Sequence, residues 1–191
     1  MPENEGIRYR ETVRALVDVF DRLGTRGIFI GGLAVSLLAE PRFTKDVDAM
    51  VMADSGELEP WLKAAADAGF KPLFDNPVPF AIQNHLLVLR HVTSNVTVDL
   101  SLGCTPFEAE IIGRATEYSL GDFSISLPSP EDLVILKAIA SRDQDLLDIK
   151  RIAEAYPRLD VDRIRCVLEE QREVLYDAKP WEQIEPLLYP K

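Results

Sequence analysis

The sequence predicts an α+β (α/β) fold, in which a region of strands and helices is followed by a purely helical region. Two observations predict it. Up to residue 127, short apolar segments bounded by turn residues alternate with segments of helical periodicity. Beyond the Pro-Ser-Pro segment at 128–130, the strand signals stop and only helical periodicity continues. We therefore expect a first domain, 1–128, and a C-terminal helical domain, 129–191, packed on it.

The individual elements follow from hydrophobic periodicity and from the turn residues between them. The first domain is expected to contain, in order, a helix at 8–23, a strand at 28–30, a short helix after a glycine pair, a strand at 46–52, a helix at 57–68 capped by Ser55, a strand at 70–74, a loop at 75–80, a hairpin of strands 85–91 and 96–102, a helix at 106–112 and a hairpin of strands 118–120 and 123–127. The second is expected to contain helices at 131–141, 143–155, 161–175 and 181–188.

Composition and charge limit the function classes. The net charge of −11 argues against broad, non-specific binding of nucleic acid, although it leaves room for a local basic groove. Cys104 and Cys166 lack CxxC spacing and are expected to be free thiols in a reducing compartment. The sequence begins without an apolar signal segment, and no apolar run approaches the ~20 residues of a membrane span. We expect a cytoplasmic protein that does not bind membranes.

The glycine pair Gly31-Gly32 directly follows the first expected strand. Glycines at a strand-to-helix turn let backbone N–H groups approach a phosphate at the positive end of the helix. A glycine pair also serves tight turns in many proteins, so the pair by itself is compatible with either role.

Three aspartates are candidates for binding a divalent cation. Asp46 and Asp48 should point to the same face of their strand, roughly 6–7 Å apart along the chain. Asp99 lies within an apolar strand, where a carboxylate is costly unless it is paired, hydrogen-bonded or bound to a metal. Carboxylate oxygens suit a hard cation such as Mg²⁺. The alternative is that these aspartates only cap turns and keep the surface soluble.

Residues 31–48 carry the pattern GG-(x)n-RxTxDxD, and a strand aspartate follows at position 99. This combination resembles the nucleotidyltransferase superfamily with the DNA polymerase β-like core. The resemblance implies a nucleotidyltransferase-like mixed β-sheet palm, with 1–128 as the catalytic domain. It also implies that Gly31 and Gly32 hold the triphosphate, and that two Mg²⁺ ions, or Mn²⁺ ions, bind to Asp46, Asp48 and Asp99. The usual pattern has serine where Gly32 stands, so one hydroxyl donor to the phosphates is missing.

The segment SPEDLVILKAIASRDQDLLDI, at 129–149, resembles the corresponding helices of AbiEii-type toxins and related small nucleotidyltransferases. In that branch a helix lysine and a downstream aspartate are functional, and they match Lys137 and either Asp145 or Asp148. Lys137 lies on an apolar helix face, so it needs a carboxylate or a phosphate as partner, or it extends to solvent. Asp145 and Asp148 can face one way because they are three residues apart on a helix.

Arg42 and Thr44 complete the candidates for nucleotide binding. Arg42 is expected to contact either phosphates or an acidic neighbour, and Thr44 to order the turn before the aspartates.

The expected function is Mg²⁺-dependent transfer of a nucleoside monophosphate from an NTP, such as ATP, to an acceptor hydroxyl. The resemblance allows three acceptors: the 3′ end of an RNA such as tRNA, a protein hydroxyl, or a small molecule such as an antibiotic. The toxin-like segment favours a toxin–antitoxin setting with an antitoxin partner. Two alternatives are a catalytically silent nucleotide-binding or interaction module on the same fold, and an α/β protein without a metal site.

Overall fold

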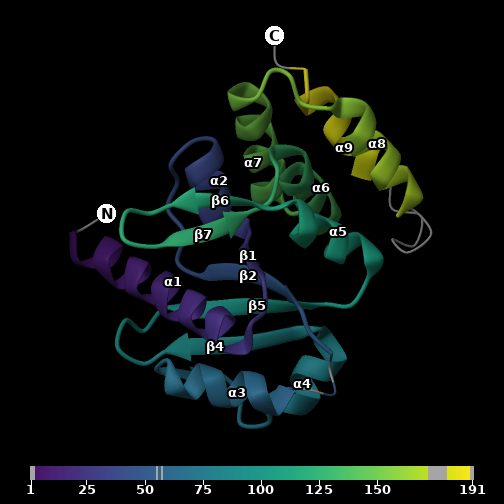
Figure 1. Ribbon diagram of the computed structural model, residues 1–191. Helices are drawn as coiled ribbons and strands as arrows, with labels where there is room; N and C mark the ends of the chain where they lie inside the picture. Colours follow the sequence, from purple (N-terminus) through teal and green to yellow (C-terminus); the bar gives the residue numbers. More distant parts are fainter. Residues whose placement is uncertain (1–2, 55, 57, 172–179, 190–191) are drawn as a thin grey trace. The chain divides into compact units, whose positions relative to one another are not determined.

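The computed structural model describes residues 3–54, 56, 58–171 and 180–189 (Figure 1). The chain forms two compact units. The first comprises the residues up to Leu33 together with Phe43–Leu127, and the second comprises Ala34–Arg42 together with the residues from Pro128 onward. The break after Leu127 lies within one residue of the expected boundary. The sequence did not indicate that Ala34–Arg42 groups with the helical part.

The first unit is built on a five-stranded mixed sheet with the strand order β1-β2-β5-β4-β3. Its strands are β1 (Gly27–Phe29), β2 (Val47–Met52), β3 (Phe70–Pro72), β4 (Leu86–His91) and β5 (Thr97–Gly103). Strand β2 pairs with β5 in parallel, and all other neighbours are antiparallel. The expected hairpin of β4 and β5 is therefore confirmed, and the α+β fold class with it.

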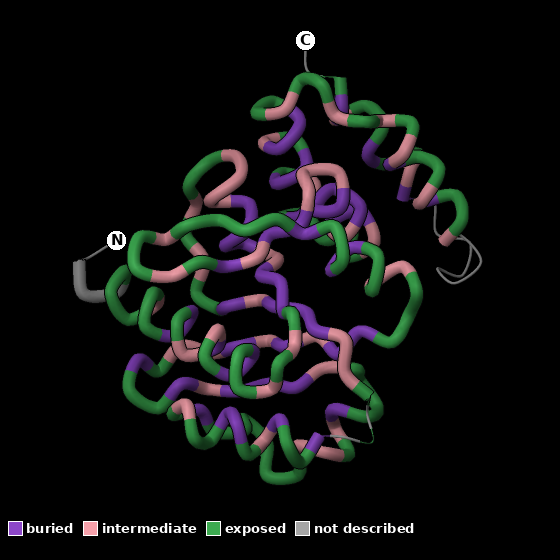
Figure 2. Tube along the Cα trace, in the orientation of Figure 1, coloured by how far each residue is buried: buried purple, intermediate pink, exposed green. Residues whose placement is uncertain are grey.

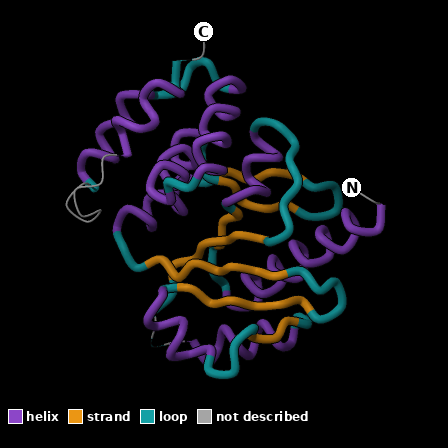
Figure 3. Tube along the Cα trace, turned by 180° about the vertical axis from the view of Figure 1, so that it is seen from behind, coloured by secondary structure: helices purple, strands orange, loops and turns teal. Residues whose placement is uncertain are grey.

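The core of the unit lies between one face of this sheet and two helices. Helices α1 (Glu3–Leu23) and α3 (Leu58–Asp67) pack against each other, α1 against β2 and α3 against β3. The ring of Phe20 on α1 contacts Phe29 of β1 at 5.9 Å and Trp61 of α3 at 6.3 Å between centroids. Figure 1 shows α1 in front of the sheet, and Figure 3, seen from behind, shows the strands in front of that helix. Both helices thus cover the same face.

The opposite face carries polar residues along β5 and is only partly buried there. Along β5 the residues alternate, so that Val98, Leu100 and Leu102 are buried whereas Thr97, Asp99 and Ser101 are half-exposed (Figure 2). An antiparallel or mixed sheet with one solvated face gives this alternation. We call this surface the polar face, and it is the face that carries the two strand aspartates.

Helix α5, a small hairpin and the start of α2 also belong to the first unit. Helix α5 (Pro106–Arg114) begins with a capping box between Thr105 and Glu108, the S/T-x-x-E arrangement in which each side chain satisfies a backbone N–H. The hairpin consists of β6 (Thr116–Ser119) and β7 (Ser124–Leu127). Helix α2 (Gly31–Leu38) begins at the glycine pair, and its residues from Ala34 onward belong to the second unit.

The expectation of a loop at 75–80 was wrong, because α4 (Pro77–Asn84) occupies that segment. Proline is accepted in the first turn of a helix, where its missing N–H would have no partner in any case. Pro77 and Pro79 both lie in that turn, and Ala81 anchors the helix with no exposed surface.

The second unit is helical, as expected. It contains α6 (Pro130–Ala140), α7 (Asp143–Ala155), α8 (Val161–Glu170), α9 (Pro180–Ile184) and a 3₁₀ turn at Glu185–Leu187. Ser129 and Asp160 cap α6 and α8 through their side chains. The expected cap Ser55 and the expected end of α8 at residue 175 lie outside the described residues. No described helix is long and apolar enough to cross a membrane.

Candidate active site

The glycine pair lies where β1 ends and α2 begins. Gly31 has a φ of +60°, a left-handed conformation that glycine adopts without strain. The backbone N–H of Ile30 donates to the carbonyl of Asp48 at 2.9 Å, which holds this turn beside β2. A Cβ atom at Gly31 would overlap the carboxylate of Asp48. The glycine is therefore needed both for the turn and for the space that this carboxylate occupies.

Asp48 and Asp99 are direct partners in the parallel register of β2 and β5. Neighbouring strands lie about 4.8 Å apart, and paired residues point to the same side of a sheet. Both side chains therefore belong to the polar face, and both are half-buried. The sequence predicted that both carboxylates lie on strands. The register adds that Asp48 and Asp99 lie directly opposite each other.

Asp46 directly precedes β2, two residues before Asp48, and is exposed. Its carbonyl accepts hydrogen bonds from the hydroxyls of Thr44 and Tyr9, both at 3.1 Å. Thr44 thus orders the turn before the aspartates, as expected. Tyr9, on α1, is a second support for this turn that the sequence did not reveal.

The fit of Mg²⁺ to these residues depends on the donor set. Three carboxylates are oxygen ligands of the kind that Mg²⁺ prefers. Because Gly31 has no side chain, the Asp48 carboxylate has room beside the turn. This room is also consistent with Asp48 as a metal ligand. Among the described residues, however, no group of three or more His, Cys, Asp or Glu side chains is arranged to hold a metal ion. The metal-binding roles of Asp46, Asp48 and Asp99 stay predictions.

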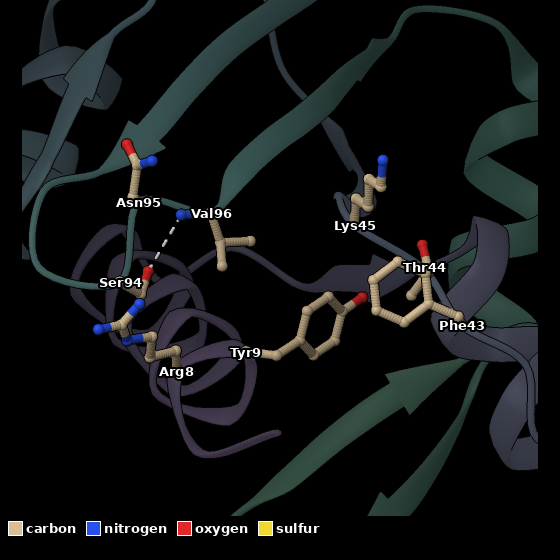
Figure 4. A pocket seen from close by; sticks show the side chains of 8 residues that line it. All are labelled: Arg8, Tyr9, Phe43, Thr44, Lys45, Ser94, Asn95 and Val96. Carbon is tan, nitrogen blue, oxygen red and sulfur yellow. Dashed lines mark hydrogen bonds between the residues drawn. The ribbon is translucent and has the colours of Figure 1, made fainter. Parts of the chain in front are cut away.

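A pocket of about 290 Å³ opens at the same end of strands β2 and β5 (Figure 4). Its walls come from α1, from the segment before β2 and from the β4–β5 turn. The lining residues are Arg8, Tyr9, Phe43, Thr44, Lys45, Ser94, Asn95 and Val96. Two cations and two aromatic rings face this space, and none of these lining residues is acidic.

The second unit contains a buried charge network around Lys137. The Nζ atom of Lys137 lies 2.7 Å from Asp145 Oδ1 and 2.9 Å from Asp148 Oδ2, and all three side chains are at most 5% exposed. The partner that Lys137 required is therefore a pair of protein carboxylates. Both carboxylates point the same way from α7, as their spacing predicted, and both contact the lysine.

Additional cations surround the two carboxylates. Arg142 Nε donates to Asp145 at 2.7 Å, and Arg151 and Arg42 bind Asp148 at 3.2 and 3.0 Å. Burial alone would raise the pKa of Asp145, but hydrogen bonds from Arg142 and Lys137, reinforced by their charges, hold that pKa below its usual value. The Asp145 carboxyl group is therefore ionised at neutral pH.

Arg42 connects this network to helix α2. Its guanidinium contacts Asp148, the acidic neighbour that the sequence allowed as one of two partners. Its backbone N–H donates to Ser36 Oγ at 3.2 Å, and that hydroxyl donates to the Arg42 carbonyl at 3.0 Å. The end of α2 is therefore fixed to the buried charges, and roles of Arg42, Lys137, Asp145 and Asp148 in nucleotide binding stay predictions.

The family model described as "Nucleotidyltransferase of unknown function (DUF6036)" matches residues 8–189. The chain belongs to this nucleotidyltransferase family. The expected membership of the nucleotidyltransferase superfamily and the expected enzyme class are thereby confirmed. No curated protein sequence matches the chain. The closer resemblance to AbiEii-type toxins stays a prediction.

Solved structures of nucleotidyltransferases share this enzyme's fold. The solution structure of the antibiotic-resistance factor ANT(2'')-Ia has a TM-score of 0.59 at 12% identity, over 88% of this chain and 94% of that chain. Its crystal structure with adenylyl-2''-tobramycin has a TM-score of 0.56 at 12% identity, over 88% and 97%. The lincosamide adenylyltransferase LnuA, bound to lincomycin, has a TM-score of 0.52 at 16% identity, over 75% and 94%. At these sequence identities, the similarity shows a shared fold and no more.

Two cationic residues of the polar face were missed by the sequence reasoning. Arg90 on β4 and Lys71 on β3 are register partners, and Arg90 is also paired with Thr97 of β5. An arginine within the apolar strand LLVLRH gives the same signal that singled out Asp99, and that signal could have identified it.

Proposed function

We propose that this nucleotidyltransferase transfers a nucleoside monophosphate from an NTP to an acceptor hydroxyl with Mg²⁺ bound to Asp46, Asp48 and Asp99. The observation that carries the proposal is the direct register of Asp48 with Asp99 beside the Gly31 turn. Two carboxylates on neighbouring strands repel each other in the ionised state, and a divalent cation offsets that repulsion. The cation would neutralise phosphate charge and stabilise the attacking and leaving oxygens.

The chain's own groups have separate roles in this reaction. The backbone at Gly31 and Gly32, at the start of α2, would bind the triphosphate. Asp99 would accept the proton of the acceptor hydroxyl. The hydroxyl oxygen then forms a bond to the α-phosphorus, the bond from that phosphorus to the β-phosphate oxygen breaks, and pyrophosphate leaves.

The charge network supports the phosphate-binding helix in this proposal. Arg42 holds the end of α2 through Ser36, and Asp148, which also contacts Lys137, binds Arg42. These residues would act by fixing the end of α2, from Ala34 onward, within the second unit. Thr44 would act in the same indirect way, because it orients the backbone of Asp46.

The acceptor remains one of the three classes, and the solved relatives favour none of them at their low identity. A toxin–antitoxin setting, with an antitoxin partner, rests on the resemblance of residues 129–149. The alternative of a silent nucleotide-binding module is disfavoured because Asp46, Asp48 and Asp99 are all present.

The proposal is tested by thermal shift with each NTP, with and without MgCl₂, and by incubating the enzyme with α-³²P-labelled NTPs and whole-cell extract. Asp48→Asn and Asp99→Asn should each reduce transfer by about 10²-fold or more while the protein stays folded. Asp67→Asn, on the exposed end of α3, makes the same chemical change away from the site and should leave transfer intact. Magnesium-dependent binding of NTP without any labelled product would favour the silent module, and full activity of Asp48→Asn would refute the metal site.

A further inference from the structure

The strand order β1-β2-β5-β4-β3 indicates from which side the acceptor approaches. The glycine pair follows β1, Asp48 lies on β2, and Asp99 lies on β5, so the three stand in sequence across the polar face. This inference rests on the proposed function, in which the triphosphate lies at the glycine pair. In an in-line displacement the attacking oxygen lies opposite the leaving oxygen. The acceptor therefore approaches over the strands beyond Asp99, which are β4 and β3.

The polar face over these two strands carries positive charge. Val88 of β4 pairs with Asp99, and Arg90 lies two residues further along the same strand. Diagonal neighbours of this kind are about 7–8 Å apart, within reach of a long side chain. Lys71 of β3 is the direct partner of Arg90 and continues the row. The other β4 side chains on this face, Leu86 and Val88, are apolar, so the charged side chains that β3 and β4 contribute to it are Lys71 and Arg90.

Arg90 has a buried guanidinium nitrogen that lacks a hydrogen-bond acceptor within the described part of the chain. Its Nε atom is buried and has no hydrogen-bond partner among the described residues. A buried donor without an acceptor is costly, and a charged one more so. The net charge of the whole chain is −11, so two neighbouring cations on this face are a local exception. An anionic group bound at Arg90 would supply the missing acceptor.

We propose that the acceptor of this enzyme carries a phosphate group that binds to Arg90 and Lys71, while its hydroxyl lies at Asp99. Phosphate is the anion that arginine binds best, through charge-assisted hydrogen bonds. Two sources have this chemistry: the 3′ end of an RNA strand, and a free nucleotide or phosphorylated sugar. A polycationic aminoglycoside such as tobramycin would be repelled by the same row.

The experiment measures transfer from α-³²P-labelled NTPs to three purified probes, which are a 12-nucleotide single-stranded RNA with a free 3′ hydroxyl, AMP, and tobramycin. The variants are Arg90→Gln, Lys71→Gln and Arg90→Lys. The control is Lys63→Gln, which removes a cation from the exposed surface of α3, on the helix-covered side of the sheet.

We expect the wild type to label a phosphate-bearing probe. Arg90→Gln should raise KM for that probe about tenfold, with KM for the NTP unchanged. Arg90→Lys should recover part of this loss, and Lys63→Gln should match the wild type. Labelling of RNA alone identifies a nucleic-acid end as the source, and labelling of AMP identifies a small phosphorylated acceptor.

Labelling of tobramycin in place of both phosphate-bearing probes would overturn the inference while leaving the proposed function intact. An unchanged acceptor KM in both Gln variants would do the same. If no probe is labelled, fluorescence anisotropy measures the affinity of each variant for the fluorescein-labelled RNA. Equal affinities of wild type and Arg90→Gln would then overturn the inference. The proposed function fails separately, if NTP binding does not depend on MgCl₂.

Discussion

Gly31 and Asp48 are in such close contact that a side chain on the glycine would occupy the position of the aspartate's carboxylate. Gly31 begins helix α2 just after β1, and Asp48 lies on the neighbouring strand β2. The Ile30–Asp48 backbone hydrogen bond fixes their approach. The turn that would bind phosphate and the carboxylate that would bind metal are therefore a single structural feature.

Gly31→Ala should abolish transfer. The added methyl group must displace the Asp48 carboxylate or the turn, and the φ of +60° adds about 1–2 kcal/mol of strain. The matched control is Gly24→Ala, which has the same φ of +60° but nothing within 4 Å of the new Cβ atom. In denaturant unfolding, Gly24→Ala should lose about 1–2 kcal/mol of stability and Gly31→Ala at least as much, because only Gly31→Ala adds a clash. If Gly24→Ala lost activity as severely as Gly31→Ala, the contact with Asp48 would not be the cause.

Lys137→Met should destabilise the protein strongly. It leaves two carboxylates buried without their shared cation, and breaking a buried pair in this way costs about 3–5 kcal/mol. The melting temperature should fall by roughly 6–20 °C, which differential scanning calorimetry measures. Lys150→Met removes an exposed lysine of α7 and should cost less than about 1 kcal/mol. Equal losses in the two variants would contradict the importance of the buried network.

Tyr9→Phe should reduce kcat without unfolding the protein. The variant removes one of the two hydroxyls that bind the Asp46 carbonyl, which is worth about 0.5–1.5 kcal/mol. We expect a loss of about threefold to tenfold in steady-state transfer assays. Tyr118→Phe, on β6, makes the same change elsewhere and should be neutral. A Tyr9→Phe enzyme with wild-type kcat would show that Thr44 holds this turn alone.

His91 should make stability depend on pH. Burial lowers the pKa of His91 below its ordinary value of 6.5, against the opposing charge of Glu11. The unfolded chain therefore binds more protons than the folded chain between the lowered pKa and 6.5, so stability falls as pH decreases through that window. Urea unfolding at pH 5 and pH 7.5 measures this slope.

The second histidine provides the control for that measurement. His91→Gln should flatten the pH dependence, whereas His85→Gln, at an exposed position, should retain it. The chain has only these two histidines, so no third one complicates the comparison. A slope that persists unchanged in His91→Gln would assign it to other groups.

The sequence predicted the parts of the site that depend on local pattern. Alternation along a strand identified the face of Asp48, and the cost of a carboxylate in an apolar strand identified Asp99. Their direct pairing could not be read from the sequence, because the register of parallel strands depends on contacts distant in the chain. The pairing of Lys71 with Arg90 was missed for the same reason, although Arg90 itself could have been found from its place in an apolar strand.

The charge network shows a second limit of sequence reasoning. The apolar surroundings of Lys137 showed that it needs an anionic partner. The sequence did not decide whether that partner is a phosphate or a carboxylate. The structure decides for carboxylates, because the packing of α7 against α6 brings Asp145 and Asp148 into contact with Lys137. The helix at Pro77–Asn84 was missed because proline signals both a loop and a helix start.

The parallel pairing of β2 with β5 also has a consequence for how the enzyme acquires its activity. The β4–β5 hairpin joins neighbouring segments of the chain and can form early. The pairing of β5 with β2 joins segments far apart in the sequence, so it forms later. Partially folded molecules would therefore have most of their helices but no paired aspartates. In a refolding experiment, the recovery of catalytic competence should lag behind the recovery of helical circular dichroism.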